Sequence, residues 1–232
     1  MITVRKSNER GHAKHGWLDS HHTFSFANYY DPRHTGFRDL LVINEDRVIG
    51  GAGFGKHGHQ DMEIVSYVLD GQLEHKDSMG TGSVLKYGDV QRMSAGTGVR
   101  HSEFNHSKEK NLHFLQIWIT PRAEGLAPGY EEKSFSTEEK KNQLRLIVSP
   151  DGAQESLHIN QDASIYASIL DEDKTVSMPL REGRHSWIQV ARGWIEVNGV
   201  KLKEGDGAAI SQEKKLEMKA LAPSEFLVFD LA

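Results

Sequence analysis

The segments GAGFGKHGHQDMEIVSYVLDGQ (residues 51–72) and TGVRHSEFN (residues 97–105) decide the fold of this chain. Each segment carries two possible metal ligands in alternation, namely His57 and His59 in the first, and His101 and Glu103 in the second. Side chains at positions i and i+2 of a β-strand leave on the same face. Two such strands facing each other therefore place three imidazoles and one carboxylate around a single point.

This set of ligands suits a divalent transition metal, because Mg²⁺ and Ca²⁺ recruit mostly oxygen. Coordination positions stay open on such a metal, and a substrate oxygen or dioxygen can bind there. A structural zinc site is normally closed by four ligands, commonly with Cys, and the sequence contains no Cys. A single His on a strand is usually a surface or core residue, so the predicted metal site rests on the two pairs occurring together.

The composition is that of an ordinary globular protein of 232 residues, with 37% hydrophobic and 26% charged residues. A formal charge of −5 and scattered Lys and Arg argue against direct binding of nucleic acid. No uncharged apolar run approaches the about 18 residues of a membrane helix, and the first residues lack the apolar core of a signal peptide. We therefore expect a cytoplasmic protein without membrane contact, and the absence of Cys agrees with that location.

From Leu40 onward, short apolar runs separated by turns such as Asp70-Gly71 predict β-strands throughout. The predicted organisation has three parts, namely an N-terminal domain with the metal site (residues 1–125), a linker (residues 126–142) and a C-terminal domain (residues 143–232). The linker is polar, and Ser136 or Thr137 is expected to cap one helical turn in it.

The C-terminal part repeats the first in weaker form. Residues 186–199 match the strand, glycine turn and strand around Gly71, which indicates two copies of one β unit. In the second copy, Arg184-His185-Ser186 offers one imidazole where the first copy has two, and nothing resembling His101-Ser102-Glu103 follows. We therefore predict that the C-terminal domain holds no metal and acts as scaffold or as a covering wall.

Two other patterns carry less weight. The glycine-rich run over residues 50–55 lets the backbone approach another element closely, but no helical pattern and no Lys-Ser/Thr ending follow it, so a phosphate-binding loop is not expected. Several histidines gather near the N-terminus, and their spacing fits no single strand or helix face, so we do not expect a second metal site there. These histidines are His12, His15, His21 and His22.

The motifs resemble those of a cupin, and further runs are similar to the pirin family of bicupins. The cupin pattern is carried by residues Gly51 to Gly71 and Gly98 to Asn105. The pirin resemblance is carried by His15 to Ser20, Thr23 to Phe26, Asn28 to Pro32 and Leu69 to Gly80. It covers the whole chain and is strongest through Trp118. It implies an all-β fold of two antiparallel jelly-roll barrels, the cupin domains, with few short helices.

The same resemblance implies which residues bind the metal. In pirins, the ligands are the residues that match His57, His59, His101 and Glu103. Cupins in general take their carboxylate from a position near Glu63, but the interval from Glu63 to Gly71 is one residue longer here than in the usual cupin pattern, so we favour Glu103. One divalent transition metal is expected, with iron as first choice and manganese, copper, nickel or zinc as alternatives.

Bacterial pirin-like proteins are associated by resemblance with quercetin 2,3-dioxygenase activity, in which O₂ opens a flavonol ring with loss of carbon monoxide. The resemblance implies a metal-dependent oxidoreductase acting on a flavonol or another small aromatic substrate. Glu103 is the expected catalytic residue, because it can accept the proton that the flavonol hydroxyl must lose. Phe54, Phe104 and Trp118 are candidates for an apolar pocket, although core packing is the commoner role of an aromatic residue.

A function of a different class stays open. Eukaryotic pirins resemble metal-bearing proteins that modulate transcription factors, so the chain is alternatively an iron-dependent interaction or redox-sensing module with a protein partner. Pocket access distinguishes the two, because aromatic residues closed over the metal would argue against an enzyme acting on a flavonol. An isomerase or epimerase of sugar phosphates is less supported, because the ligand strands are flanked by few basic residues, Lys56 and Arg100.

Overall fold

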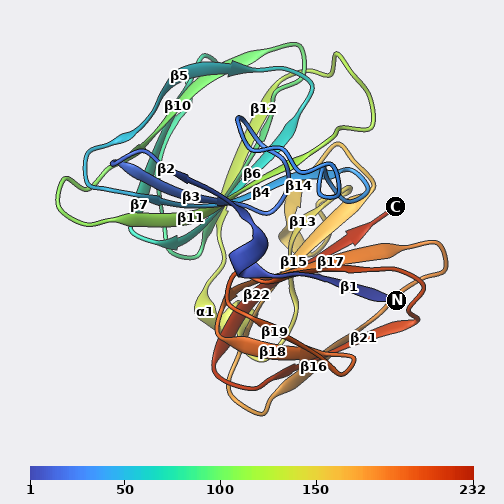
Figure 1. Ribbon diagram of the computed structural model, residues 1–232. Helices are drawn as coiled ribbons and strands as arrows, with labels where there is room; N and C mark the ends of the chain where they lie inside the picture. Colours follow the sequence, from blue (N-terminus) through green and yellow to red (C-terminus); the bar gives the residue numbers. More distant parts are fainter. The chain divides into compact units, whose positions relative to one another are not determined.

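The computed structural model describes residues 1–232 and consists almost wholly of β-strands (Figure 1). The all-β fold predicted from the sequence is confirmed. The chain divides into two compact units. Unit N comprises Gly11–Ser134 and Leu157–Gln161, and unit C comprises Met1–Arg10, Phe135–Ser156 and Asp162–Ala232. These units differ in extent from the domains expected over residues 1–125 and 143–232, because the start of the chain groups with unit C.

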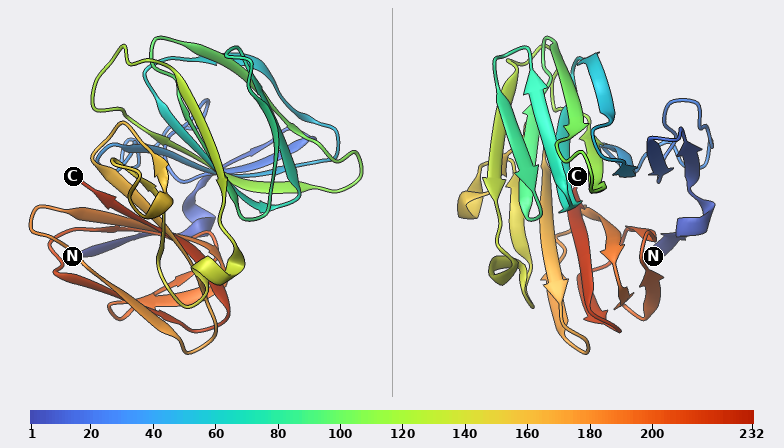
Figure 2. Two further views of the ribbon diagram at one scale, coloured as in Figure 1. Left: turned by 180° about the vertical axis from the view of Figure 1, so that it is seen from behind. Right: turned by 90° about the vertical axis from the view of Figure 1, so that its left-hand side faces the viewer.

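Unit N folds into two sheets that face each other (Figure 2). Its large sheet has the strand order β12-β9-β6-β11-β4-β3-β2, and its small sheet has the order β5-β10-β7-β8. The strands of this unit are β2 (Gly11–Lys14), β3 (Leu18–His22), β4 (Leu40–Val48), β5 (Gly53–His59), β6 (Glu63–Asp70), β7 (Gln72–Asp77), β8 (Gly82–Lys86), β9 (Asp89–Ser94), β10 (Val99–Asn105), β11 (Leu112–Ile119), β12 (Gly129–Ser134) and β14 (Leu157–His158).

Unit C has the same arrangement of two sheets. One sheet runs β1-β20-β17-β22-β15-β13, and the other runs β16-β21-β18-β19. The strands are β1 (Ile2–Arg5), β13 (Arg145–Ser149), β15 (Ala163–Leu170), β16 (Thr175–Pro179), β17 (His185–Arg192), β18 (Trp194–Val197), β19 (Val200–Lys203), β20 (Gly207–Ile210), β21 (Lys215–Ala220) and β22 (Ser224–Leu231).

The strand orders confirm the internal repeat. The run β9-β6-β11-β4 of unit N corresponds to β20-β17-β22-β15 of unit C, and β5-β10-β7-β8 corresponds to β16-β21-β18-β19. In both units a glycine leads the chain from one sheet to the other, Gly71 with φ +80° and Gly193 with φ +82°. A Cβ atom would lie 2.6 Å from the carbonyl oxygen of Asn111 at Gly71 and 2.2 Å from that of Pro223 at Gly193. The left-handed backbone and the close approach both require glycine.

Helices are few and short, namely α1 (Thr137–Lys140) and the 3₁₀ turns η1 (Ser7–Glu9) and η2 (Ala153–Glu155). Ser136 caps α1. The Ser136 hydroxyl accepts a hydrogen bond from the backbone N–H of Glu139, and the Glu139 carboxylate accepts one from the backbone N–H of Ser136. The helical turn predicted at Ser136 or Thr137 is thus confirmed. None of these helices has the length and apolar character needed to span a membrane, and the cytoplasmic location stays a prediction.

The interiors of the two units differ. Unit C buries an apolar cluster to which both of its sheets contribute, with Ile188 and Phe226 from one sheet and Met218 from the other. Unit N has separate apolar clusters around Phe114 and around Ile64. A row of buried polar side chains lies between these clusters.

The polar row of unit N crosses neighbouring strands of its large sheet. Asn44 on β4 is paired with Gln116 on β11, and Gln116 is paired with Ser66 on β6. All three side chains are buried. Burial of polar groups costs free energy unless they are hydrogen-bonded. This row therefore indicates that the interior of unit N has a role besides stabilising the fold.

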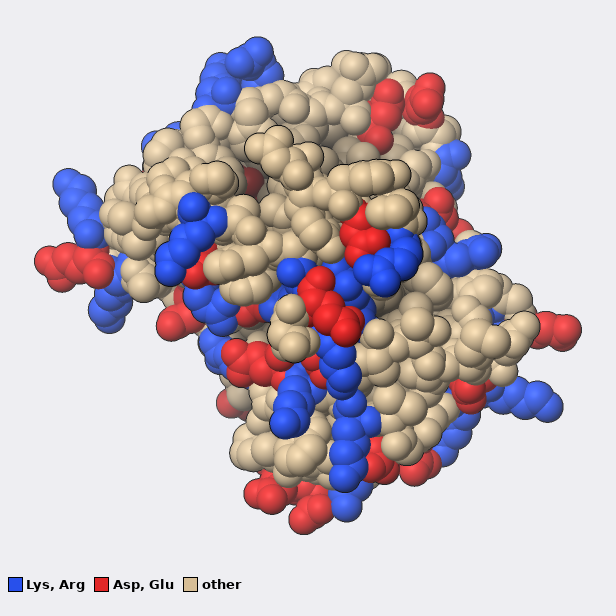
Figure 3. Space-filling view, in the orientation of Figure 1, with Lys and Arg blue, Asp and Glu red and all other residues tan.

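The surface carries mixed charge. On the face shown in Figure 3, Lys and Arg side chains are interspersed with Asp and Glu side chains. Some form exposed ion pairs, such as Lys219 with Asp173 at 2.9 Å and Lys215 with Glu217 at 3.4 Å. Pairs of this kind stabilise a fold by at most about 1 kcal/mol each, so the fold rests on the buried sheets.

Replacement of Gly193 tests the role of the turn between the sheets of unit C. We expect Gly193→Ala to lower the free energy of unfolding by about 1–2 kcal/mol through left-handed strain and by a further ~1–3 kcal/mol because Pro223 must move. Gly199→Ala is the matched control, since its φ is +83° and nothing lies within 4 Å of the added Cβ. Urea unfolding followed by circular dichroism measures both variants, and equal losses would contradict the proposed packing role of Gly193.

Candidate metal centre

The small sheet of unit N brings the predicted ligands together. His57 and His59 lie on β5, and His101 and Glu103 lie on β10. In the antiparallel pairing of these strands, His101 is opposite His57 and Val99 is opposite His59. The register shifts between His101 and Glu103, and such an irregularity re-aims side chains locally. Strand pairing therefore gathers histidines that lie far apart in the sequence.

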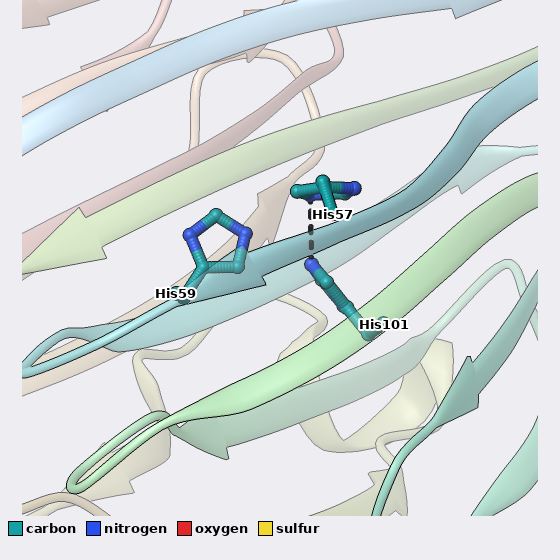
Figure 4. A group of neighbouring side chains, drawn as sticks. All are labelled: His57, His59 and His101. Atoms are coloured by element: carbon teal, nitrogen blue, oxygen red, sulfur yellow. Dashed lines mark hydrogen bonds between the residues drawn. The ribbon is translucent and has the colours of Figure 1, made fainter.

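The three imidazoles point toward one another (Figure 4). The Nε2 atoms of His57 and His101 are 3.0 Å apart. The ring centroid of His59 lies 4.8 Å from the centroids of both other rings. Metal–nitrogen bonds of about 2.0–2.1 Å place two ligand nitrogens roughly 3.0–3.4 Å apart around one ion. The spacing of His57 and His101 fits such an ion.

The surroundings favour the neutral form of His59 and His101, which is the form that binds a metal. Burial, followed by the charge of His57, lowers the pKa of His59 to about 4 and that of His101 to about 2. The Nδ1 of His57 lies 2.8 Å from the carbonyl oxygen of Gly55. An N–H at that position donates to the carbonyl and leaves the Nε2 lone pair facing His101.

A buried nitrogen provides a further test of whether a metal fits. The Nε2 of His59 is buried and has no hydrogen-bond partner in the protein. A buried polar atom without a partner is costly, and a metal ion bound among the three rings would satisfy it. The donor set of imidazole nitrogens therefore suits a divalent transition metal.

Glu103 contributes a buried carboxylate beside the histidines. Its side chain is 3% exposed, and its Oε2 lies 4.0 Å from the Nε2 of His101. The Gln116 amide donates to both carboxylate oxygens, at 3.2 and 3.1 Å, and the Ser66 hydroxyl donates to Oε1 at 3.4 Å. Burial raises the pKa of Glu103 to about 7. A carboxylate with a raised pKa is a better proton acceptor than an exposed one.

The alternative carboxylate, Glu63, is engaged elsewhere. It is 1% exposed. The Ser94 hydroxyl donates to one oxygen at 2.9 Å, and the Asn160 amide donates to the other at 3.1 Å. These hydrogen bonds favour Glu103 over Glu63 as the carboxylate of the centre.

Sequence reasoning missed a further buried histidine. His75 lies on β7 opposite Glu103 and forms a second group of possible ligands with His101 and Glu103. Its Nε2 lies 3.1 Å from the Asp77 carboxylate, and its ring stacks on Tyr130 at 4.9 Å. Burial lowers the pKa of His75. The sequence did offer one signal for this histidine, because His75 stands two residues before Asp77 on a predicted strand.

A cavity of about 80 Å³ lies beside His57 and Glu103. Phe26, Phe54 and Trp118 form the aromatic part of its wall. The rings of Phe26 and Trp118 meet edge to face at 5.3 Å. The pocket predicted for Phe54 and Trp118 is therefore present, and the ring of Trp118 also contacts that of His59.

The prediction for Phe104 is wrong. This side chain is 38% exposed and does not line the cavity. It follows Glu103 directly on β10, and neighbouring residues on a strand point to opposite faces. Because Glu103 faces the interior, Phe104 faces outward.

The N-terminal histidines form a separate group at the surface. His12 on β2 is paired with His21 on β3, and their rings stack at 4.5 Å. The Oδ1 of Asp19 lies 3.0 Å from His12 and 3.5 Å from His21. This carboxylate accounts for the pairing of the two rings. Because His12 and His21 lie on different strands, the spacing along either strand does not predict their pairing across the hairpin.

The fold and the centre define a bicupin with a histidine cluster in one of its two units. A model of the pirin family matches residues 3–119, and a model of the quercetinase C-terminal cupin domain matches residues 146–231. The chain is 49% identical over 231 residues to quercetin 2,3-dioxygenase of Escherichia coli strain K12, covering 100% of this chain and 99% of the relative. It is 38% identical over 234 residues to a pirin-like protein of Caulobacter vibrioides, covering 100% of both. The chain belongs to the pirin family.

Solved structures agree with this assignment. The crystal structure of YhhW from Escherichia coli superposes with a TM-score of 0.97 at 49% identity, covering 100% of this chain and 98% of that one. The bacterial pirin YhhW from Escherichia coli in complex with nickel(II) gives a TM-score of 0.95 at 48% identity, covering 100% and 99%. A member of the family with this fold therefore binds a transition metal.

Removal of one imidazole tests which histidine group binds metal. We expect His57→Ala to weaken Ni²⁺ binding by more than about 100-fold, beyond the loss typical of residues that only support a ligand. His12→Ala is the matched control from the surface group and should bind Ni²⁺ as the unmodified protein does. Equilibrium dialysis with metal analysis measures both. Loss of binding in His12→Ala together with its retention in His57→Ala would assign the metal to the other group.

Proposed function

We propose that this protein is a metal-dependent quercetin 2,3-dioxygenase, which uses O₂ to open the heterocyclic ring of a flavonol and releases carbon monoxide. The observation that carries the proposal is the centre itself, a cluster of three imidazoles of which His57 lines, together with the buried Glu103, a cavity walled by aromatic rings. Further support comes from the full-length identity of 49% with an enzyme of that name.

The proposed cofactor is one divalent metal ion. Its proposed ligands are His57, His59, His101 and Glu103. Iron is our first choice, while manganese, copper, nickel and zinc can use the same donors. When bound, the metal supplies Lewis acidity and redox capacity for the reaction of the flavonol with O₂. Unit C, which buries an apolar cluster, is proposed to act as scaffold.

Glu103 is the proposed catalytic base. A flavonol must lose the proton of its 3-hydroxyl group to become a good reductant, and a carboxylate at the cavity can accept that proton. Hydrogen bonds from Gln116 and Ser66 hold the carboxylate in place before the substrate arrives. A preorganised group of this kind loses little free energy to reorientation during the reaction.

The aromatic wall has two roles in this proposal. Phe26, Phe54 and Trp118 offer apolar surface to a planar ring. They also limit the access of water, which would otherwise return a proton to the flavonolate. The ring of Trp118 lies 4.9 Å from that of His59, so the wall reaches the imidazole cluster.

The size of the cavity limits how a flavonol can enter. Its volume of about 80 Å³ is well below the about 300–1,000 Å³ of common small-molecule pockets. The cavity therefore accepts one edge of a flavonol unless the turn that carries Phe26 moves. That turn is closed by a pair of backbone hydrogen bonds between Phe26 and Tyr29, at 3.0 and 2.9 Å.

The same observation favours a second candidate function. A cavity of about 80 Å³ admits O₂ more readily than a flavonol, which suits a redox-sensing or interaction protein that has no dedicated substrate. Its partner would be another protein, and binding would depend on the oxidation state of the metal. Equal affinity for that partner with reduced and oxidised metal would exclude this candidate.

Metal-loaded protein is expected to consume quercetin and O₂ in equal amounts and to release carbon monoxide. The visible absorbance of quercetin and an oxygen electrode follow the two reactants. Protein stripped of metal by a chelator is the control, and it should regain activity when the metal is restored. An unchanged quercetin signal beside an active reference enzyme would rule out the dioxygenase.

Replacement of the proposed base, Glu103, tests its role in turnover. Glu103→Gln should keep part of the bound metal but lower kcat by about 10²–10⁴-fold, because a positioned base contributes that much. Glu63→Gln is the matched control, as a second buried glutamate of unit N whose oxygens contact Ser94 and Asn160. It should keep its kcat. Unchanged turnover in Glu103→Gln would remove this residue from the mechanism.

A further inference from the structure

Two polar side chains of β4 face the cavity from the side opposite the imidazoles. Asn44 and Asp46 are two residues apart on this strand, so they share a face. They are 3% and 4% exposed and line the cavity together with His57 and Glu103. The proposed reaction, as described so far, uses neither of them.

Three polar atoms in the wall of this cavity are left without partners. The Oδ1 of Asn44, the Oδ1 of Asp46 and the indole Nε1 of Trp118 are buried and make no hydrogen bond within the protein. Most buried polar atoms in folded proteins are hydrogen-bonded, because an unpaired one loses its hydration without compensation. A concentration of three such atoms at one small cavity points to a ligand that pairs with them.

The Gln116 side chain, which also lines the cavity, is hydrogen-bonded. Gln116, the strand neighbour of Asn44, donates to Glu103 and accepts a hydrogen bond from Ser66 at 2.7 Å. Asp46 has a hydrogen bond to Ser20 on the neighbouring strand, which leaves its Oδ1 as the unpaired oxygen. Among the residues that line the cavity, the buried unpaired polar atoms are thus the Oδ1 atoms of Asn44 and Asp46 and the Nε1 of Trp118.

The chemistry of the three atoms defines what can bind. Asn44 and Asp46 present acceptors, and Trp118 presents a donor. An anion would be repelled by the Asp46 carboxylate when it is ionised, and a bare cation could pair with the two oxygens but would leave the indole N–H without an acceptor. A purely apolar group would leave all three unpaired. A hydroxyl group both donates and accepts, so it can pair with an acceptor on β4 and with the indole.

We propose that Asn44, Asp46 and Trp118 form a subsite that binds a hydroxyl group of the aromatic substrate and selects polyhydroxylated flavonols over those that carry only the 3-hydroxyl. This inference rests on the proposed function, because it names the substrate class of the same site. The cavity, at about 80 Å³, takes the hydroxylated edge of a ring, while the rest of the flavonol extends beyond it.

Water is the competing occupant, since it also donates and accepts. A cavity of about 80 Å³ has room for two or three waters at roughly 30 Å³ each. A substrate hydroxyl replaces one of these waters and reproduces its hydrogen bonds, whereas a ring edge without hydroxyls displaces water and leaves the polar atoms unpaired. The subsite therefore discriminates chiefly by penalising ligands that lack the hydroxyl.

Calorimetric binding of two flavonols to the metal-loaded protein tests the subsite without relying on turnover. The probes are quercetin and 3-hydroxyflavone, which lacks every other hydroxyl of quercetin. The unmodified protein should bind quercetin about 10–100-fold more tightly, as expected when buried polar groups lose their partner. The exposed variant Glu172→Gln is the control and should keep that ratio.

Variants of the subsite should abolish this preference selectively. Asp46→Leu, which keeps the branched shape and the number of heavy atoms but removes the acceptor, should bring the affinity ratio close to one while 3-hydroxyflavone still binds. Asp46→Asn, which keeps one acceptor oxygen, should give an intermediate ratio. Trp118→Phe removes the indole N–H and should also lower the ratio, which covers the case that Asp46→Leu fails to fold.

The outcomes separate this inference from the proposed function. Selective binding that is lost in these variants supports the subsite even where no flavonol is turned over. If the protein turns over flavonols but every variant keeps the same ratio of quercetin to 3-hydroxyflavone affinity, the subsite is overturned. The cavity would then hold water only. Failure of the unmodified protein to prefer quercetin also overturns it.

Discussion

The centre depends on the register between β5 and β10. Their pairing sets His101 opposite His57, and a slip of one residue would turn the interior side chains of β10 outward. The close approach of the strands relies on Gly53, where a Cβ would lie 2.3 Å from the carbonyl oxygen of Glu103. The glycine-rich run before the histidines therefore serves strand packing, as the sequence indicated, and the chemistry follows from that packing.

A comparison of the two units shows the free-energy cost of placing the metal centre in the interior of unit N. Both have the same strand order, but unit C buries an apolar cluster and unit N places polar side chains between two apolar ones. Hydrogen bonds among Ser66, Gln116 and Glu103 offset part of the cost of burial. Atoms that face the cavity stay unpaired, so unit N keeps a less favourable interior at the place where a ligand can bind. Unit C also buries polar side chains, such as Gln189 and Ser168, but the imidazole cluster and the cavity beside it belong to unit N.

The sequence predicted those features that follow from the alternation of side chains between the two faces of a single strand. His57 and His59 share a face because they are two residues apart, and the same holds for His101 and Glu103. The turns at Gly71 and the capped helical turn at Ser136 are local as well. Neglect of the same alternation explains the wrong prediction for Phe104, whose neighbour Glu103 already occupied the inner face.

Features that depend on pairing between distant strands could not be read from the sequence. His75 joins the group around Glu103 through the pairing of β7 with β10, and His12 meets His21 across a hairpin. The pairing of Ile2 with Ile210, which groups the N-terminal strand with unit C, is equally non-local. The most direct test is anomalous diffraction from a crystal of the metal-loaded protein. We predict one ion bound by the imidazoles of β5 and β10 and by Glu103, whereas an ion at the surface group around Asp19, or a Glu103 carboxylate turned away from the ion, would contradict this structure-based assignment.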